Sequence, residues 1–218
     1  MADNGRGVLF DIDGTLLDTS YLHTIAWWQA FRDAGHEVPM REIHRAIGMG
    51  GDKLIPHLIG KDDDDISTGH AHHYAPFLER LVAFDGAADL LRECRSRGLT
   101  VVLATSAKSW QLDRLRRAIG ADDAIEHITD ADDVQESKPA PDIVQAALTK
   151  SGLAPEQAVM VGDTKWDVES AASCGVACVG MLTGGWSEDE LRDAGAAEVY
   201  TGPRDLLERL DASVLVKG

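Results

Sequence analysis

The stretch Gly7-Val8-Leu9-Phe10-Asp11-Ile12-Asp13-Gly14 decides the fold of this chain. Its first four residues form a short apolar run, which predicts a strand, and the abrupt change at Asp11 predicts a loop directly after that strand. The same change from an apolar run to a polar loop recurs further along the sequence, and this recurrence indicates the fold class.

Several later runs repeat the pattern and alternate with segments of helical spacing. The run from Leu99 to Ala104 is β-branched and almost wholly apolar, as expected for a strand covered on both faces. Four helical segments each stop at a glycine that precedes the next strand, which fits a left-handed C-cap. These repeats predict an α/β fold with a doubly wound parallel sheet, whose sites lie beyond the carboxyl ends of the strands. The other predicted strands are 158–161, 175–179, 125–128 and 198–200, and the predicted helices are 87–97, 110–119, 141–151 and 168–174.

Residues 17–84 break this alternation. They contain no convincing strand and are predicted to be helical over 21–34, 40–47, 52–59 and 66–83. The block is far longer than a connecting loop, whose median length is about 4–6 residues. We therefore expect a small all-helical cap domain at 17–84, inserted into an α/β core formed by 1–16 and 85–218.

Composition limits the partners of the chain. Among 218 residues there are 21 Lys and Arg against 37 Asp and Glu, a formal net charge of −16, so we expect no binding to nucleic acid or to anionic membranes. Hydrophobic residues make up 44% and charged residues 27%, which is typical of a globular protein rather than a disordered one. No apolar run approaches the roughly 18 residues of a membrane span, and we expect no secretory signal. Three cysteines in no zinc-binding pattern indicate reduced thiols and a cytoplasmic protein, a monomer by default with a dimer as the alternative.

Polar side chains suited to catalysis follow the predicted strands, at one edge of the sheet. Several carboxylates gathered there repel one another and require a cation, and oxygen-only ligands favour Mg²⁺ over zinc or copper. A magnesium site beside a hydroxyl, an ammonium group and a further carboxylate suits phosphoryl transfer. Two acids separated by one residue can differ in protonation state, one acting as nucleophile and the other as general acid and base. The residues concerned are Asp11, Asp13, Thr105, Ser106, Lys138, Asp163 and Asp167.

Four motifs carry a family resemblance. Asp11-Ile12-Asp13-Gly14-Thr15-Leu16-Leu17-Asp18-Thr19 looks like motif I of the haloacid dehalogenase superfamily, and Thr105-Ser106 is similar to motif II. Lys138-Pro139 resembles motif III, and Gly162-Asp163-Thr164-Lys165-Trp166-Asp167 resembles motif IV. The motifs occur in order and at family-like separations over essentially the whole chain. The helical insert resembles the cap of the subgroup that contains phosphoglycolate phosphatase and β-phosphoglucomutase.

The resemblance implies a role for each matching residue. Asp11 is implied as the nucleophile that forms an aspartyl-phosphate, and Asp13 as the acid that protonates the leaving group and the base that then activates water. Mg²⁺ is the implied cofactor, bound by Asp11, the backbone carbonyl of Asp13 and Asp163, with Asp167 binding through water or orienting the shell. The implied partner is a small phosphorylated metabolite. The phosphoryl group would be bound by Thr105, Ser106 and Lys138, where Ser106 replaces the asparagine of many relatives.

Three functions compete at this point. Asp13 separates phosphohydrolases and mutases from the dehalogenase branch, which has no acid there. In the mutase a cap arginine holds a second phosphate, and Gly51 stands at that place here, so a phosphatase is favoured over a mutase of the β-phosphoglucomutase type. A phosphoacceptor signalling module is the alternative from a different class, but receivers are about half this length and carry no inserted cap.

Some predictions concern the insert itself. Gly48, Gly50 and Gly51 are predicted to form a flexible loop that faces the active site, with Arg45 and Lys53 as candidate substrate contacts. Asp18 and Thr19 are expected to cap the first helix. The sequence leaves the substrate open among phosphoglycolate, sugar phosphates, nucleotides and pyrophosphate. We further expect a solvated polar face at His70, His72 and His73, and core positions at Trp27, Trp28 and Phe31.

Overall fold

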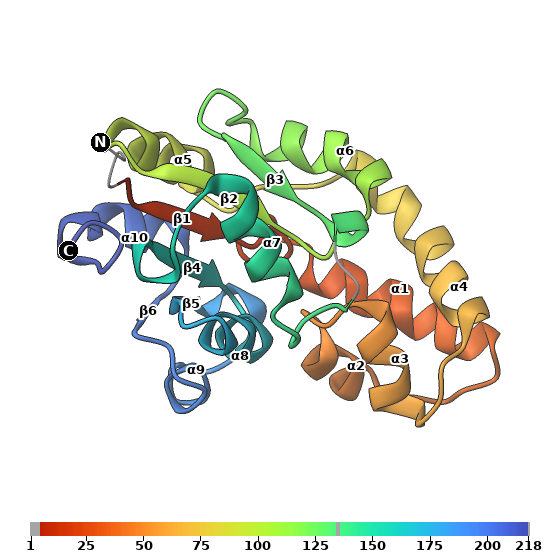
Figure 1. Ribbon diagram of the computed structural model, residues 1–218. Coiled ribbons are helices and arrows are strands. Elements are labelled where there is room, and N and C mark those ends of the chain that lie inside the picture. The colour runs from red at the N-terminus through yellow and green to blue at the C-terminus, as the bar shows by residue number, and fades with distance from the viewer. Residues whose placement is uncertain (1–4, 134–135, 218) are drawn as a thin grey trace.

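A computed structural model of the chain describes residues 5–133 and 136–217. Its centre is a six-stranded sheet with the order β3-β2-β1-β4-β5-β6, and every neighbouring pair is parallel (Figure 1). The predicted α/β fold is therefore confirmed. The strands are β1 (Gly7–Phe10), β2 (Thr100–Ala104), β3 (His127–Thr129), β4 (Ala158–Gly162), β5 (Ala177–Met181) and β6 (Glu198–Tyr200).

Helices cover both faces of the sheet. Side chains alternate between the two faces along each strand, and both faces are apolar. Val8 and Phe10 of β1 belong to one apolar core, and Leu9 between them belongs to the other. The sheet is thus doubly wound, as predicted. The first core is covered by α5 (Ala87–Ser96), α6 (Ser109–Ile119) and α10 (Pro203–Glu208), and the second by α7 (Asp142–Ser151), α8 (Lys165–Ser173) and α9 (Glu188–Asp193).

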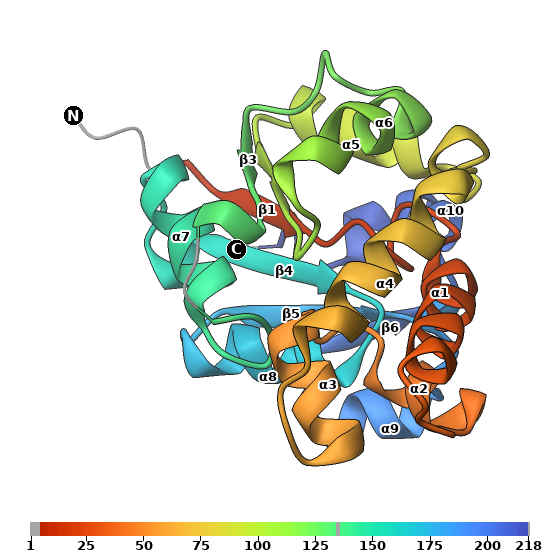
Figure 2. The ribbon, with the colours of Figure 1, turned by 90° about the vertical axis from the view of Figure 1, so that its right-hand side faces the viewer.

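The helices between β1 and α5 pack into apolar cores of their own, and we call them the helical insert. The chain leaves and re-enters the sheet through two adjacent segments, joined by a hydrogen bond from the Phe84 N–H to the Leu16 carbonyl (2.9 Å). The insert lies beyond the carboxyl ends of β1 and β4, as both ribbon views show (Figures 1 and 2). It consists of α1 (Ser20–Asp33), α2 (Met40–Ala46), α3 (Gly51–Ile59), α4 (Asp64–Tyr74) and a 3-10 helix (Ala75–Glu79).

The prediction of one continuous helix over 66–83 is wrong. The α-helix ends at Tyr74 and continues only as a 3-10 turn, because Pro76 has no N–H to donate and its ring disfavours α-helical bonding. The helix predicted over 168–174 begins three residues earlier, at Lys165, because the Thr164 hydroxyl caps its N-terminus. The short helices α9 and α10 were not predicted, since six residues carry too little periodicity.

Two other expectations concern the whole chain. Within the described ranges, no helix combines the length and the apolarity needed to cross a membrane. All three cysteines are free thiols, and Cys94 and Cys178 are buried.

The four glycines expected to stop helices all have positive φ, as the C-cap prediction requires. They are Gly98, Gly120, Gly152 and Gly175.

Candidate active site

The site lies where the strand order reverses, between β1 and β4. Asp11 follows β1 and Asp163 follows β4, and the Asp11 N–H donates to the Val161 carbonyl (2.9 Å), which keeps the two strand ends in register. Open parallel sheets form a crevice at such a reversal, outside the carboxyl ends of the strands. The topology therefore brings motif I and motif IV together.

Three buried carboxylates meet in this crevice. One oxygen each of Asp11, Asp163 and Asp167 lies within 4.8 Å of the others. The Lys138 ammonium lies against two of them, 2.5 Å from Asp11 Oδ1 and 2.7 Å from Asp167 Oδ1, with 1% of its side chain exposed. One ammonium group against three carboxylates leaves the cluster short of positive charge.

The pKa values of these groups reflect that shortage. Burial raises the pKa of Asp11 to about 7, with Asp167 adding to the shift and Lys138 opposing it. Burial, together with the neighbouring Asp167 and Asp11, also raises the pKa of Asp163 well above its ordinary range. Both shifts are those expected of carboxylates that need more positive charge nearby.

The donor set fits a hard divalent cation. Its ligands are all oxygens, and Asp163 Oδ2 is buried with no hydrogen-bond donor among the described residues. Oxygen-only carboxylate clusters are typical of Mg²⁺ sites. The side chain of Asp13 is not part of this cluster, so only its backbone carbonyl remains as the ligand that the sequence predicted.

Two threonines hold the acids in place. The Thr15 hydroxyl donates to Asp163 Oδ1 (2.8 Å), which fixes the orientation of that carboxylate across the crevice. Thr164 donates to Asp167 Oδ2 through both its hydroxyl (2.6 Å) and its backbone N–H (3.1 Å). These bonds fix the orientation of the Asp163 and Asp167 carboxylates in the cluster.

Asp13 faces the helical insert instead. Its Oδ1 accepts a hydrogen bond from the Thr19 hydroxyl (2.7 Å) and lies 3.2 Å from His23 Nε2. Burial would raise the pKa of Asp13, but His23 and Thr19 outweigh that effect and hold its pKa below the ordinary value. Thr19 stands at the N-cap position of α1 but makes no side-chain cap bond, so the predicted capping role of its hydroxyl is wrong.

A stack of rings extends from Asp13 into the insert. His23 Nδ1 lies 3.1 Å from His70 Nε2, and the His23 ring stacks on Tyr74 with 3.9 Å between centroids. His70 stacks on Trp27 at the same spacing. Burial, then the nearby His23 and Lys108, lower the pKa of His70 well below its usual range. The prediction of a solvated face is therefore wrong for His70, which packs inward, and is confirmed for His72, which is exposed.

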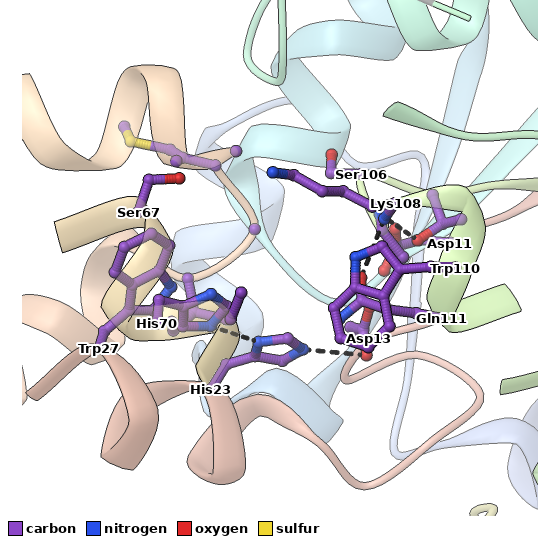
Figure 3. Close-up of a pocket in the computed structure, with 18 residues that line it drawn as sticks. Asp11, Asp13, His23, Trp27, Ser67, His70, Ser106, Lys108, Trp110 and Gln111 are labelled. Atoms are coloured by element: carbon purple, nitrogen blue, oxygen red, sulfur yellow. Dashed lines mark hydrogen bonds and ion pairs between the residues drawn. The ribbon is translucent and has the colours of Figure 1, made fainter. Parts of the chain in front are cut away.

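Asp11 and Asp13 line a pocket between the core and the insert (Figure 3). Thr105 and Ser106, the residues of motif II, line the same pocket. Trp27, expected to be core, is 5% exposed and also forms part of the pocket wall. The Lys108 side chain extends into the open space between the two walls, as Figure 3 shows. The insert contributes Ile47, Gly48, Met49, Gly50, Gly51, Ser67, His70 and Ala71 to the lining.

Comparison with known proteins identifies the family. Residues 6–175 match the family described as "Hydrolase: haloacid dehalogenase-like hydrolase", which is well over half of the chain. The chain belongs to the haloacid dehalogenase-like hydrolase family. The predicted resemblance is thus confirmed, and membership in a hydrolase family decides for an enzyme over the phosphoacceptor signalling module.

Individual relatives agree with this assignment. Phosphoglycolate phosphatase of Escherichia coli (strain K12) is 29% identical over 235 residues, covering 94% of this chain and 92% of that protein. The chain is also 29% identical to the protein SUPPRESSOR OF QUENCHING 1, chloroplastic, of Arabidopsis thaliana, covering 88% of this chain but spanning only 19% of the length of that protein. A solved hydrolase structure from Pseudomonas syringae is 34% identical, with a TM-score of 0.89 over 95% of this chain and 98% of that one.

The predicted substrate contacts of this haloacid dehalogenase-like hydrolase divide into two groups. Gly50 lines the pocket, so its contact with substrate stays a prediction. Arg45 does not, because its guanidinium group pairs with Glu190 and lies over the Trp186 ring. Lys53 lies outside the pocket as well, since its ammonium group pairs with Glu136 (2.9 Å). The predictions for Arg45 and Lys53 are therefore wrong for the described arrangement.

Several functional positions were missed in the sequence. His23 contacts Asp13, and Lys108 and Gln111 line the pocket, yet none of them belongs to a motif. Lys108 follows motif II by two residues and precedes α6, so its proximity to a strand end was the available signal. His23 lies one helical turn after Thr19, and that spacing places it above the motif I loop.

Proposed function

We propose that this hydrolase is a Mg²⁺-dependent phosphatase, which hydrolyses a small organic phosphomonoester through an aspartyl-phosphate. The observation that carries the proposal is the position of Asp11, which lines the pocket, is 6% exposed, pairs with Lys138 and is grouped with the buried Asp163 and Asp167. A magnesium ion held by these acids would supply positive charge for the phosphoryl oxygens.

In the first half-reaction Asp11 acts as nucleophile. Its Oδ1 is held by Lys138, whereas its Oδ2 accepts only a long hydrogen bond from Thr15 (3.4 Å), so Oδ2 is the oxygen free to attack phosphorus. The new bond joins Asp11 to phosphorus, and the bond from phosphorus to the leaving oxygen breaks. Thr105, Ser106 and Lys138 lie where they can neutralise or hydrogen-bond the phosphoryl oxygens.

Asp13 moves the proton in both half-reactions. Its lowered pKa makes it a carboxylate in the resting protein, which suits a base that removes a proton from the hydrolytic water. A bound phosphate adds negative charge next to it and raises its pKa, and this favours the protonated form that the leaving oxygen needs in the first step. Water then attacks the phosphorus of the aspartyl-phosphate, Asp11 leaves, and inorganic phosphate is released.

We further propose the domain division 17–84 for the cap and 1–16 with 85–218 for the core. The separate apolar cores of the insert and the adjacent entry and exit segments support these boundaries. A cap over the pocket would exclude bulk water and select the leaving group. The free thiols support a cytoplasmic location, and we propose a monomer as the default state.

The charges of the pocket favour a phosphatase over a mutase. Among the described residues that line it, Lys108 is the one lysine or arginine. The backbone of Gly51 lies in the wall, and Arg45 is held elsewhere, so the insert presents no arginine to a second phosphate. One ammonium group suits a small monoester better than a bisphosphate intermediate.

The test is a screen of phosphorylated metabolites with the purified protein. We expect Mg²⁺-dependent release of inorganic phosphate from one or more small monophosphates and from p-nitrophenyl phosphate. Asp11→Asn should abolish release while circular dichroism stays unchanged, because the amide cannot attack phosphorus. Isomerisation of a sugar phosphate without phosphate release would support the mutase, and normal turnover by Asp11→Asn would refute the mechanism.

A further inference from the structure

The last turn of α2 touches the core at two points that flank the metal-binding acids. His44 Nε2 lies 3.0 Å from the Gly184 carbonyl oxygen. The Trp166 indole N–H donates to the Arg45 carbonyl oxygen (3.2 Å), and Trp166 directly precedes Asp167 in the chain. Gly184 lies against the other acid, because a Cβ at that position would lie 2.0 Å from Asp163 Oδ2.

The Arg45 side chain clamps this turn to the core. Its guanidinium carbon lies 3.4 Å from the centroid of the Trp186 ring, and both of its terminal nitrogens reach the Glu190 carboxylate. Glu190 is itself fixed, since it accepts hydrogen bonds from the Ser187 N–H (2.9 Å) and hydroxyl (2.9 Å). Those bonds, with Arg45, lower the pKa of Glu190 to about 2, so the carboxylate stays charged at neutral pH. A planar guanidinium between a ring and a carboxylate is well suited to hold one orientation.

The clamp bears directly on the pocket, because the wall-forming loop Ile47–Gly51 begins two residues later. In this loop Gly48 has φ +100, and a Cβ there would lie 2.6 Å from Thr164 Oγ1. Thr164 is the residue that holds Asp167 through two hydrogen bonds. The backbone of the loop is therefore seated on the N-terminus of α8, at the metal side of the site.

We propose that Arg45 is a positioning residue, which docks the helical insert on the core through Trp186 and Glu190 and so holds the loop Ile47–Gly51 over the phosphate pocket. Arg45 does not touch substrate in this assignment. Removing its side chain releases the loop from the core, so the pocket is more often open to water. Only the kinetic arm of the test below rests on the proposed phosphatase function.

The first test is hydrogen exchange measured by mass spectrometry on Arg45→Ala. The Ile47 N–H donates to Ile43 and the Met49 N–H to Ala46, so peptides over 40–51 report on the docked turn and loop. We expect exchange there to rise about tenfold, since a cation–π contact and a fixed ion pair are lost, while peptides over β1 and β2 keep the native rate. Arg41→Ala is the matched control, because Arg41 lies on the same helix, its side chain is 85% exposed and it pairs with its neighbour Glu42 rather than with the core.

The second test is kinetic, with p-nitrophenyl phosphate. Arg45→Ala should raise KM about tenfold and leave inhibition by inorganic phosphate within twofold of wild type, because Thr105 and Lys138 are untouched. Arg45→Lys keeps the charge but not the contact through two nitrogens, so its KM should lie between that of wild type and that of Arg45→Ala. In a double-mutant cycle, the effects of Arg45→Ala and Glu190→Gln on KM should be non-additive.

Each outcome decides the matter. Local exchange in Arg45→Ala equal to that of Arg41→Ala would overturn the proposal. If Arg45→Ala raises exchange equally in every peptide, the milder variants Arg45→Lys and Glu190→Gln decide. An increase confined to 40–51 in these variants would support the proposal, and an equal increase in every peptide would make Arg45 a residue of general stability and overturn it. Failure of the wild-type protein to release phosphate would refute the proposed function but leave the exchange result standing.

Discussion

Lys138 shows at the scale of one residue how a buried charge can serve a site. Its ammonium group has 1% exposure and lies between Asp11 and Asp167, and these carboxylates outweigh the effect of burial and raise its pKa. A lysine in an apolar interior would lose its proton, so the charge persists here because two acids surround it. The same group then faces the position where phosphoryl oxygens would collect negative charge.

Lys138→Met should therefore reduce kcat about 10²–10³-fold, the usual effect of removing one donor to developing charge. The variant should also lose thermal stability in metal-free buffer, because it leaves carboxylates buried without a counter-charge. Lys150→Met is the control, since Lys150 forms its ion pair with Asp133 near the surface. Steady-state kinetics and thermal denaturation measure both effects, and a kcat within twofold of wild type would show that Lys138 does not act on the reaction.

His23 supports Asp13 in a way that can be tested separately. His23→Phe keeps a ring to stack on Tyr74 but removes the nitrogen 3.2 Å from Asp13 and the one 3.1 Å from His70. We expect kcat to fall roughly tenfold, a part of the about 10²–10⁴-fold that general acid–base catalysis contributes. His72→Phe, on an exposed position of α4, should leave kcat unchanged. Equal kcat for both variants would remove His23 from the proton-transfer machinery.

The acids and Lys138 could each be predicted from the sequence, whereas the residues that contact and orient the acids could not. Asp11 and Asp163 end strands whose apolar runs are plain in the sequence, and parallel strands must bring their carboxyl ends together. His23 and His70 come from two helices that meet only through tertiary packing, and no spacing in the sequence encodes their 3.1 Å contact. Arg45 was assigned to substrate because it is a cation near a glycine loop, but Glu190, far away in the chain, competes for it.

At the scale of elements, the sheet was easier to predict than the insert. Short apolar runs are plain for β1, β2, β4 and β5 and weaker for β3 and β6, and the predicted positions of all six strands agree with the structure to within a few residues. The insert depends on amphipathic helices, and there the pattern continued past Pro76 although the α-helix did not. A single proline changes hydrogen bonding without changing the apolar periodicity, which is why periodicity alone gave the wrong end.

The junction between β2 and α6 belongs to this scale, because one short segment supplies Thr105, Ser106 and Lys108 to the pocket. Lys108→Met should raise KM about tenfold for a phosphomonoester whose leaving group carries a carboxylate, such as phosphoglycolate, since one charged hydrogen bond is lost. KM for p-nitrophenyl phosphate, whose leaving group has no carboxylate, should stay within twofold. Initial rates with the two substrates provide the comparison, and equal changes for both would show that Lys108 does not select the leaving group.

At the scale of the whole molecule, the net charge of −16 opposes the approach of an anionic substrate. Salt screens such repulsion beyond about 10 Å at 0.1 M ionic strength, so binding is decided locally by Lys108 in the pocket lining, by the buried Lys138 behind Asp11 and by the cation that the acids would hold. The acid cluster is thus a place where the fold gives up stability for function, because three buried carboxylates face one ammonium group.

This loss of stability for function predicts that one substitution raises the Tm of the metal-free protein but abolishes its stabilisation by Mg²⁺. Asp163→Asn removes a buried charge whose pKa is already raised by burial and by Asp167, while its side-chain carbonyl can still accept from Thr15. We expect the metal-free variant to melt about 2–4 °C above metal-free wild type, since relief of about 1 kcal/mol moves Tm by that amount in a protein of this size. Millimolar Mg²⁺ should raise the Tm of the wild type and lose that effect in the variant, because only a folded site binds the ion. Asp189→Asn, an exposed position on α9, should change neither value. Differential scanning calorimetry with EDTA and with Mg²⁺ measures all four states, and an Asp163→Asn protein that Mg²⁺ stabilises as much as wild type would place the ion elsewhere.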